Sequence, residues 1–180
     1  MRLIRIELLK LKPYIPFWIL LGAYVAMMLG LCLWVPSFID WWSEQGANFQ
    51  GVLPSTMPIF DFDEIWQNIT FLGRFFFPIL AFLVIIIINN ETSYNTLKQN
   101  IIDGMSRKEW LFSKILILLS IVVLATLLQF FSGLYLGFNH SSVQGADYVL
   151  HNIAFLPAYS VQLTLFLSLA MFITIVVRKA

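Results

Sequence analysis

The chain has 180 residues, of which 59% are hydrophobic and only 12% are charged, and its formal net charge is +1. Soluble domains are about 45–50% apolar and about 25% charged, so a soluble chain of this length could not bury so much apolar surface. The near-zero net charge gives no reason to expect a nucleic-acid partner. The single cysteine, Cys32, excludes an intramolecular disulfide and carries no information about the compartment.

Residues 1–12 predict an amphipathic helix that lies on the membrane surface. An apolar stripe in this segment lies opposite the basic side chains Arg2, Arg5 and Lys12. Such a segment suits the interface, where basic groups meet anionic lipid headgroups. The alternative interpretation is a plain positively charged flank before the first membrane span.

Four long apolar runs then follow, and only Arg74 and Lys114 place a charge inside them. The predicted transmembrane helices cover residues 17–35, 71–88, 111–138 and 153–177. The first would reach about 28 Å as a helix, close to the hydrocarbon thickness of about 30 Å, and is too long for a cleaved signal peptide. Runs of this length without alternation predict helices, because lipid accepts only helices or closed barrels. The fold class expected is therefore all-α: a single transmembrane domain over residues 1–180, built as a polytopic bundle of four helices.

Basic residues predict the orientation of this bundle. Ten of the eleven lysines and arginines lie in or beside residues 1–12 and 89–110 or follow the fourth span, which leaves only Arg74 for the other side. Since cytoplasmic loops carry the excess of lysine and arginine, the N-terminus is expected in the cytoplasm and the loops 36–70 and 139–152 outside. The protein is thus expected in the cell inner membrane, as a multi-pass protein. Arg74 is expected to snorkel outward or to pair with an acidic residue of the outer loop.

Acidic and histidine side chains gather in the predicted outer loops. Asp61, Asp63 and Glu64 suggest either a cation site or a solvated acidic surface, and the pattern alone favours the surface. His140 and His151 lie eleven residues apart with no cysteine nearby. This spacing matches no metal-binding motif, so no metal site is expected.

An apolar stripe occurs in the loop between the second and third spans. Tyr94, Leu97 and Ile101 are spaced i, i+3 and i+7, which places them on one face of a short cytoplasmic helix. Two interpretations of this helix remain open. It is either a docking element for a soluble partner or a surface helix lying among the headgroups.

A helix-start signal follows the stripe. Ser106 and Glu109 have the spacing of a capping box, in which each residue satisfies a backbone N–H of the other. The third membrane helix is therefore expected to begin a turn or more inside the cytoplasm, with the Lys114 side chain snorkelling toward the surface.

This loop resembles the first cytoplasmic loop of the ABC-2 type transporter permeases, the membrane subunits of ATP-binding-cassette exporters. The matching residues, in the family's order, are Glu91, Thr96, Leu97, Ser106, Arg107, Glu109 and Lys114. Asn95 stands where many members have glycine. The resemblance implies a homodimer or heterodimer of permeases, bound to two ATPase subunits that hold ATP and Mg²⁺, with no cofactor in this chain. It also implies that the loop is a coupling helix that seats in the ATPase. Together with the apolar stripe, this gives six candidate docking residues: Glu91, Tyr94, Thr96, Leu97, Ile101 and Arg107.

The expected function is therefore export of a substrate, driven by ATP that a separate subunit hydrolyses. The chain has no GxxxxGK[ST] phosphate loop, so it is not expected to be an enzyme itself. No aspartate or glutamate lies inside a span, which disfavours an ion-driven carrier. The alternative is a non-transporting accessory or assembly protein of the membrane.

Uncharged polar residues mark two of the predicted spans. Thr126, Gln129 and Ser132 share a face of the third span, and Gln162 and Thr164 lie on the fourth. Such residues line a substrate path or, more commonly, pack helices together. Permeases of the family usually have six spans, so a sequence with four favours a truncated chain over the alternative, a complete four-span protein.

Overall fold

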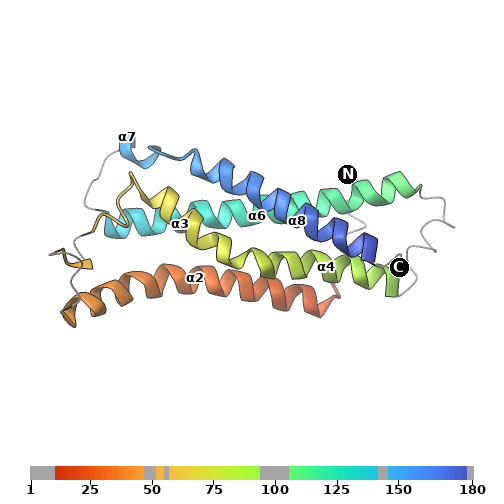
Figure 1. Ribbon diagram of the computed structural model, residues 1–180, viewed down its shortest axis with the longest axis horizontal. Coiled ribbons are helices and arrows are strands. Elements are labelled where there is room, and N and C mark those ends of the chain that lie inside the picture. The colour runs from red at the N-terminus through yellow and green to blue at the C-terminus, as the bar shows by residue number, and fades with distance from the viewer. Residues whose placement is uncertain (1–10, 47–51, 55–56, 94–105, 142–145, 178–180) are drawn as a thin grey trace. The chain divides into compact units, whose positions relative to one another are not determined.

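The computed structural model describes residues 11–46, 52–54, 57–93, 106–141 and 146–177 (Figure 1). Its elements, in chain order, are α2 (Ile15–Glu44), α3 (Ile65–Gly73), the 3₁₀ helix η2 (Arg74–Phe76), α4 (Phe77–Ser93), α6 (Arg107–His140), α7 (Ala146–Val149) and α8 (Phe155–Val177). Within these ranges there is no β-strand, and four helices are long and apolar enough to cross a membrane. The all-α membrane fold is therefore confirmed. Most of the predicted surface helix, residues 1–12, lies outside the described residues. The same holds for the central part of the predicted coupling loop, residues 89–110.

Helix α2 extends well past the first predicted span, because it continues from Ile15 to Glu44. Its 30 residues correspond to a length of about 45 Å. Pro36 lies inside the helix and removes one N–H donor, which membrane helices tolerate. The tryptophans Trp41 and Trp42, which the sequence placed in a loop, are therefore part of α2.

The second span is divided into α3, η2 and α4. Its helix begins at Ile65 rather than at Phe71, because residues of the first turns of α3 are buried by tertiary packing. The 3₁₀ turn occurs just before Pro78, which lacks the N–H that would bond to the carbonyl of Arg74. Arg74 itself is exposed on this turn and forms no ion pair with a described residue. The expected pairing with an acidic side chain is thus not seen in the described part of the chain.

The chain divides into two compact units, and α2, α6 and α8 contribute residues to both. Unit 1 comprises residues 1–24, 76–125 and 160–180. Within it, α4 and α8 bury Leu80, Leu83, Leu163 and Leu167 completely. The rings of Phe77 and Phe166 lie 5.7 Å apart. Packing of leucine and phenylalanine therefore forms the core of this unit.

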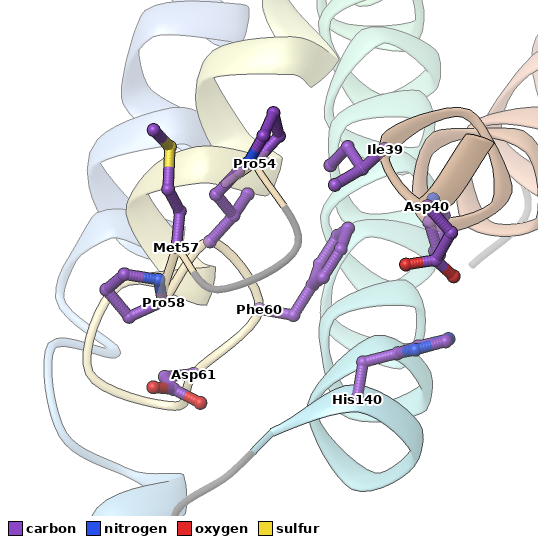
Figure 2. Close-up of a pocket in the computed structure, with 10 residues that line it drawn as sticks. Ile39, Asp40, Pro54, Met57, Pro58, Phe60, Asp61 and His140 are labelled. Carbon is purple, nitrogen blue, oxygen red and sulfur yellow. The ribbon is translucent and has the colours of Figure 1, made fainter. Parts of the chain in front are cut away.

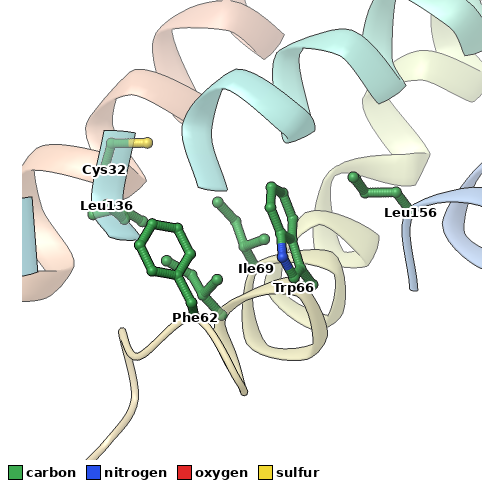
Figure 3. Packing of buried hydrophobic residues seen from close by; sticks show 7 residues of the cluster. Cys32, Phe62, Trp66, Ile69, Leu136 and Leu156 are labelled. Atoms are coloured by element: carbon green, nitrogen blue, oxygen red, sulfur yellow. The ribbon is translucent and has the colours of Figure 1, made fainter. Parts of the chain in front are cut away.

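Unit 2 comprises residues 25–75 and 126–159 and has an aromatic core (Figure 3). Its buried cluster consists of Cys32, Phe62, Ile65, Trp66, Ile69, Leu136 and Leu156. The Trp66 ring is fully buried and stacks on Phe130, with ring centroids 5.6 Å apart and an interplanar angle of 9°. Its Nε1 donates a hydrogen bond of 2.9 Å to the carbonyl of Val149. One side chain therefore joins α3, α6 and the segment before α8.

Two glycines of α6 make this aromatic packing possible. A Cβ atom at Gly133 would lie 2.7 Å from the Trp66 ring, and one at Gly137 would overlap the ring of Phe62. Both contacts are too close for a real Cβ atom, so this packing requires glycine at the two positions. The absence of side chains lets the two rings contact the backbone of α6.

Candidate functional site

The start of α6 is fixed by reciprocal hydrogen bonds between Ser106 and Glu109. The Ser106 N–H donates to Glu109 Oε2 at 2.8 Å, and the Glu109 N–H donates to Ser106 Oγ at 3.2 Å. The Ser106 hydroxyl also donates to Glu109 Oε2 at 2.9 Å, and its carbonyl accepts from Trp110 at 3.1 Å. These bonds satisfy N–H groups that have no partner within the helix. They fix the position at which α6 begins.

Replacing Ser106 by alanine is expected to loosen this first turn. Loss of an N-cap side chain costs about 1 kcal/mol, which corresponds to roughly fivefold faster amide hydrogen exchange at residues 107–110. Exchange measured by mass spectrometry checks this. Ser120→Ala is the matched control, because the Ser120 hydroxyl donates to the Leu116 carbonyl within the same helix. Equal exchange in both variants would contradict a capping role.

The residues that the sequence suggests for ATPase docking run from the last turn of α4 to the first residue of α6. Glu91 belongs to the last turn of α4, and Arg107 is the first residue of α6. The other four candidates, Tyr94, Thr96, Leu97 and Ile101, lie outside the described residues. The two helix ends that flank them lie at the same end of unit 1, at the right of Figure 1. Two long helices thus flank these candidates along the chain.

Lys114 lies one to two turns into α6, and it is buried rather than surface-exposed. Its side chain is only 3% exposed and borders a small gap that is also lined by Ile87, Ile88 and Met171. The sequence indicated a snorkelling lysine, because nothing local reveals that α4 and α8 cover this position. The finding places the Lys114 side chain inside unit 1, close along the chain to the segment between α4 and α6.

Two of the polar residues predicted on the third span lie in a buried polar group of unit 2. Gln129 is fully buried, and its Nε2 donates to the carbonyl of Ile69. A Cβ atom at Gly73 would lie 2.7 Å from that Nε2, so glycine is required for the contact. Gln129 Oε1 has no partner among the described residues. Ser132 is 8% exposed and forms a side-chain hydrogen bond with Cys32.

This buried group consists of hydrogen-bonding side chains on α3 and α6. Thr70, also fully buried, donates to the carbonyls of Trp66 and Gln67 at 2.7 and 3.0 Å. Thr126, on the same helix as Gln129, is half-buried. The arrangement joins α3 to α6 at the residues that precede the break in the second span. Polar bonds of this kind hold membrane helices together.

The polar residues of the fourth span lie in unit 1 and do not form a comparable group. Thr164 is half-buried, and its hydroxyl donates to the Ser160 carbonyl at 2.7 Å, within α8. Gln162 is exposed on an open face of α8, beside Ser168 and apolar residues of the same helix. Thr164 is thus engaged in its own helix, while Gln162 is accessible to lipid or to a partner.

The arrangement of four long apolar helices defines a multi-pass α-helical membrane protein. A family model described as ABC-2 family transporter protein matches residues 3–180. The chain therefore belongs to the ABC-2 transporter family and is a membrane component of an ABC transporter. No curated protein and no solved structure matches it.

Proposed function

We propose that this chain is the permease subunit of an exporter that uses ATP hydrolysed by a separate ATP-binding-cassette subunit. The observation that carries the proposal is the family match over residues 3–180, which covers both of the helix ends that flank the docking segment. ATP and Mg²⁺ would bind to the ATPase subunit, and this chain would supply the membrane path. A second permease protomer, identical or related, completes the proposed complex.

Coupling is proposed to pass through the segment between α4 and α6. An apolar stripe of Tyr94, Leu97 and Ile101 has the spacing that helix-in-groove docking uses. The capped start of α6 supports this role, because a fixed helix end moves together with the segment that it anchors. Nucleotide binding would then shift the spans through differential contacts of the ATPase with two states of the permease.

A Leu97→Asp variant tests this docking. The aspartate would place a charge in an apolar groove, so the variant is expected to retain less than about a tenth of the co-purifying ATPase, a loss of at least about 1.4 kcal/mol. The measurement is affinity purification of the chain co-expressed with candidate ATP-binding-cassette ATPases from the same genome, followed by ATP hydrolysis. The chain alone should hydrolyse no ATP.

Leu53→Asp is the matched control for Leu97→Asp. Leu53 is 44% exposed and belongs to unit 2, so the same change of residue there should leave the ATPase bound. Wild-type amounts of ATPase with Leu97→Asp would refute docking through this segment. A wild-type chain that binds no ATPase would favour the accessory-protein alternative.

The proposed orientation places the N-terminus and the docking segment in the cytoplasm of the inner membrane. Single cysteines at Ser106 and at Leu53, in a Cys32→Ala background, test it, because both positions are exposed. An impermeant thiol reagent added to intact cells should label the cysteine at 53 and leave the one at 106 unlabelled. The reverse pattern would invert the orientation.

A further inference from the structure

The α3 end of the second span is held firmly within unit 2. The Asn152 side chain donates a hydrogen bond of 2.7 Å to the carbonyl of Asp63, just before α3. The rings of Phe60 and His140 lie 5.5 Å apart, at the end of α6 (Figure 2). The segment that leads into α3 therefore contacts both α6 and the residues before α8, and these contacts fix this end of the span.

The helix of the second span is interrupted directly after α3, at the 3₁₀ turn η2. The N–H of Arg74 donates to the carbonyl of Phe71, three residues back, and Pro78 has no N–H for the carbonyl of Arg74. The Thr70 hydroxyl donates to carbonyls of its own helix, a type of bond that bends helices. None of the three residues of η2 is buried. Little packing therefore opposes a change of bend at this turn, and a 3₁₀ turn inside a longer helix often marks a hinge.

One side chain of α6 holds α3 at the edge of this interruption. Gln129 is fully buried, and its Nε2 donates to the carbonyl of Ile69. The same amide group lies so close to Gly73, the last residue of α3, that a Cβ atom there would lie 2.7 Å from Nε2 and 2.8 Å from Oε1. The contact thus fixes the position in which α3 reaches η2.

The contact with α3 satisfies only half of the Gln129 amide. Its Oε1 has no partner among the described residues. Turning the amide over would not help, because Oε1 would then face the carbonyl of Ile69, which is also an acceptor. A buried acceptor without a partner is costly, so the contact holds α3 less tightly than a fully satisfied amide would. A second conformation, in which Gln129 has left Ile69, is therefore close in free energy.

We propose that the second span is a two-state element that changes its bend at η2, and that Gln129 is the positioning residue that holds it in the conformation described here. Only the drive for this change rests on the proposed function. Helix α4 runs from Phe77 to Ser93 and leads into the docking segment, so a movement of that segment would be passed along α4 to η2. The bend itself is a property of this chain and does not need the ATPase.

Fluorine NMR of the purified chain in phosphatidylcholine nanodiscs tests the two-state turn without an ATPase, so its result is independent of the proposed function. The label is trifluoromethylphenylalanine in place of Phe75, which is 68% exposed and whose ring lies 5.7 Å from that of Phe71. The matched control is the same label in place of Phe131, which is 62% exposed on the uninterrupted α6 and has an aromatic neighbour, Phe130, at 5.6 Å. Relaxation dispersion is expected at position 75, from a minor state of about 1–10%, and not at position 131.

A pair of substitutions links this exchange to Gln129. Gly73→Ala would place a methyl group against the Gln129 amide, so it is expected to raise the ratio of minor to major state at least about fivefold. In a Gln129→Ala background there is no amide to displace, so Gly73→Ala is expected to change that ratio by less than about twofold. A general effect of alanine on the helix would be the same in both backgrounds.

Two results would overturn the two-state bend: no dispersion at position 75 in the otherwise unchanged chain, or equal dispersion at position 131. Equal effects of Gly73→Ala in the two backgrounds would overturn the role of Gln129. If the Gly73→Ala chain does not fold, Gln129→Ala alone decides this second point, because an unchanged ratio of the two states in that variant would show that Gln129 does not hold the turn.

Discussion

Replacing Trp66 by alanine is expected to lower the free energy of unfolding by about 3–5 kcal/mol. The Trp66 side chain is fully buried, stacks on Phe130 and contacts the backbone of α6 at Gly133. Alanine would leave a cavity in the core of unit 2 and would remove the bond to Val149. The destabilisation comes from lost packing and a lost hydrogen bond inside the protein, so it is expected in lipid and in detergent alike.

Thermal unfolding of the purified protein in detergent measures this effect. Trp34→Ala is the control, because Trp34 is 78% exposed and its removal creates no internal cavity. Its unfolding temperature should stay close to that of the wild type. If the two variants unfold at the same temperature, Trp66 does not have the central packing role that the structure gives it.

Gly137→Ala is expected to destabilise the protein by about 1–3 kcal/mol through overpacking. The added methyl group would overlap the ring of Phe62, which is itself only 1% exposed and has no free space to enter. Either the segment before α3 shifts away from α6, or the ring leaves its rotamer. Both responses should lower the unfolding temperature in detergent.

Gly30→Ala separates overpacking from the general effect of glycine in a helix. A Cβ atom at Gly30 would meet nothing within 4 Å, and Gly30 lies inside α2. Alanine is favoured over glycine in a helix by roughly 0.5–1 kcal/mol, so this variant should be as stable as the wild type or more stable. A stabilising Gly137→Ala variant would show that the close contact with Phe62 is absent in solution.

The four spans could be predicted from the sequence because length and hydrophobicity alone determine which segments can cross a bilayer. The face of the third span could also be predicted, since Gln129 and Ser132 are spaced on one side of a helix and both are buried. In each case the signal lies within one segment. Such a signal can be recognised without knowing which other helices pack against that segment.

The core of unit 2 could not be predicted in the same way. Trp66 and Val149 are separated by 83 residues. From the sequence alone, Trp66 could not be distinguished from a tryptophan of the aromatic belt at the membrane interface. The importance of Gly133 and Gly137 depends on rings that arrive from another part of the chain. Burial of Lys114 likewise depends on neighbours from α4 and α8. Contacts distant in sequence leave no periodic pattern, so only the structure reveals them.

The length of α2 has a consequence for the membranes that suit this protein. Exposed Trp18 and Trp41 lie 23 residues apart in one helix, a distance of about 34 Å along its axis. At a typical tilt of about 20° that distance projects to roughly 32 Å, the hydrocarbon thickness of a thick membrane. Since indole rings prefer the headgroup level, we expect the two tryptophans to lie at opposite interfaces when α2 crosses a membrane. Thinner bilayers should therefore increase the tilt of α2, and bilayer thickness becomes a variable to control whenever activity is reconstituted.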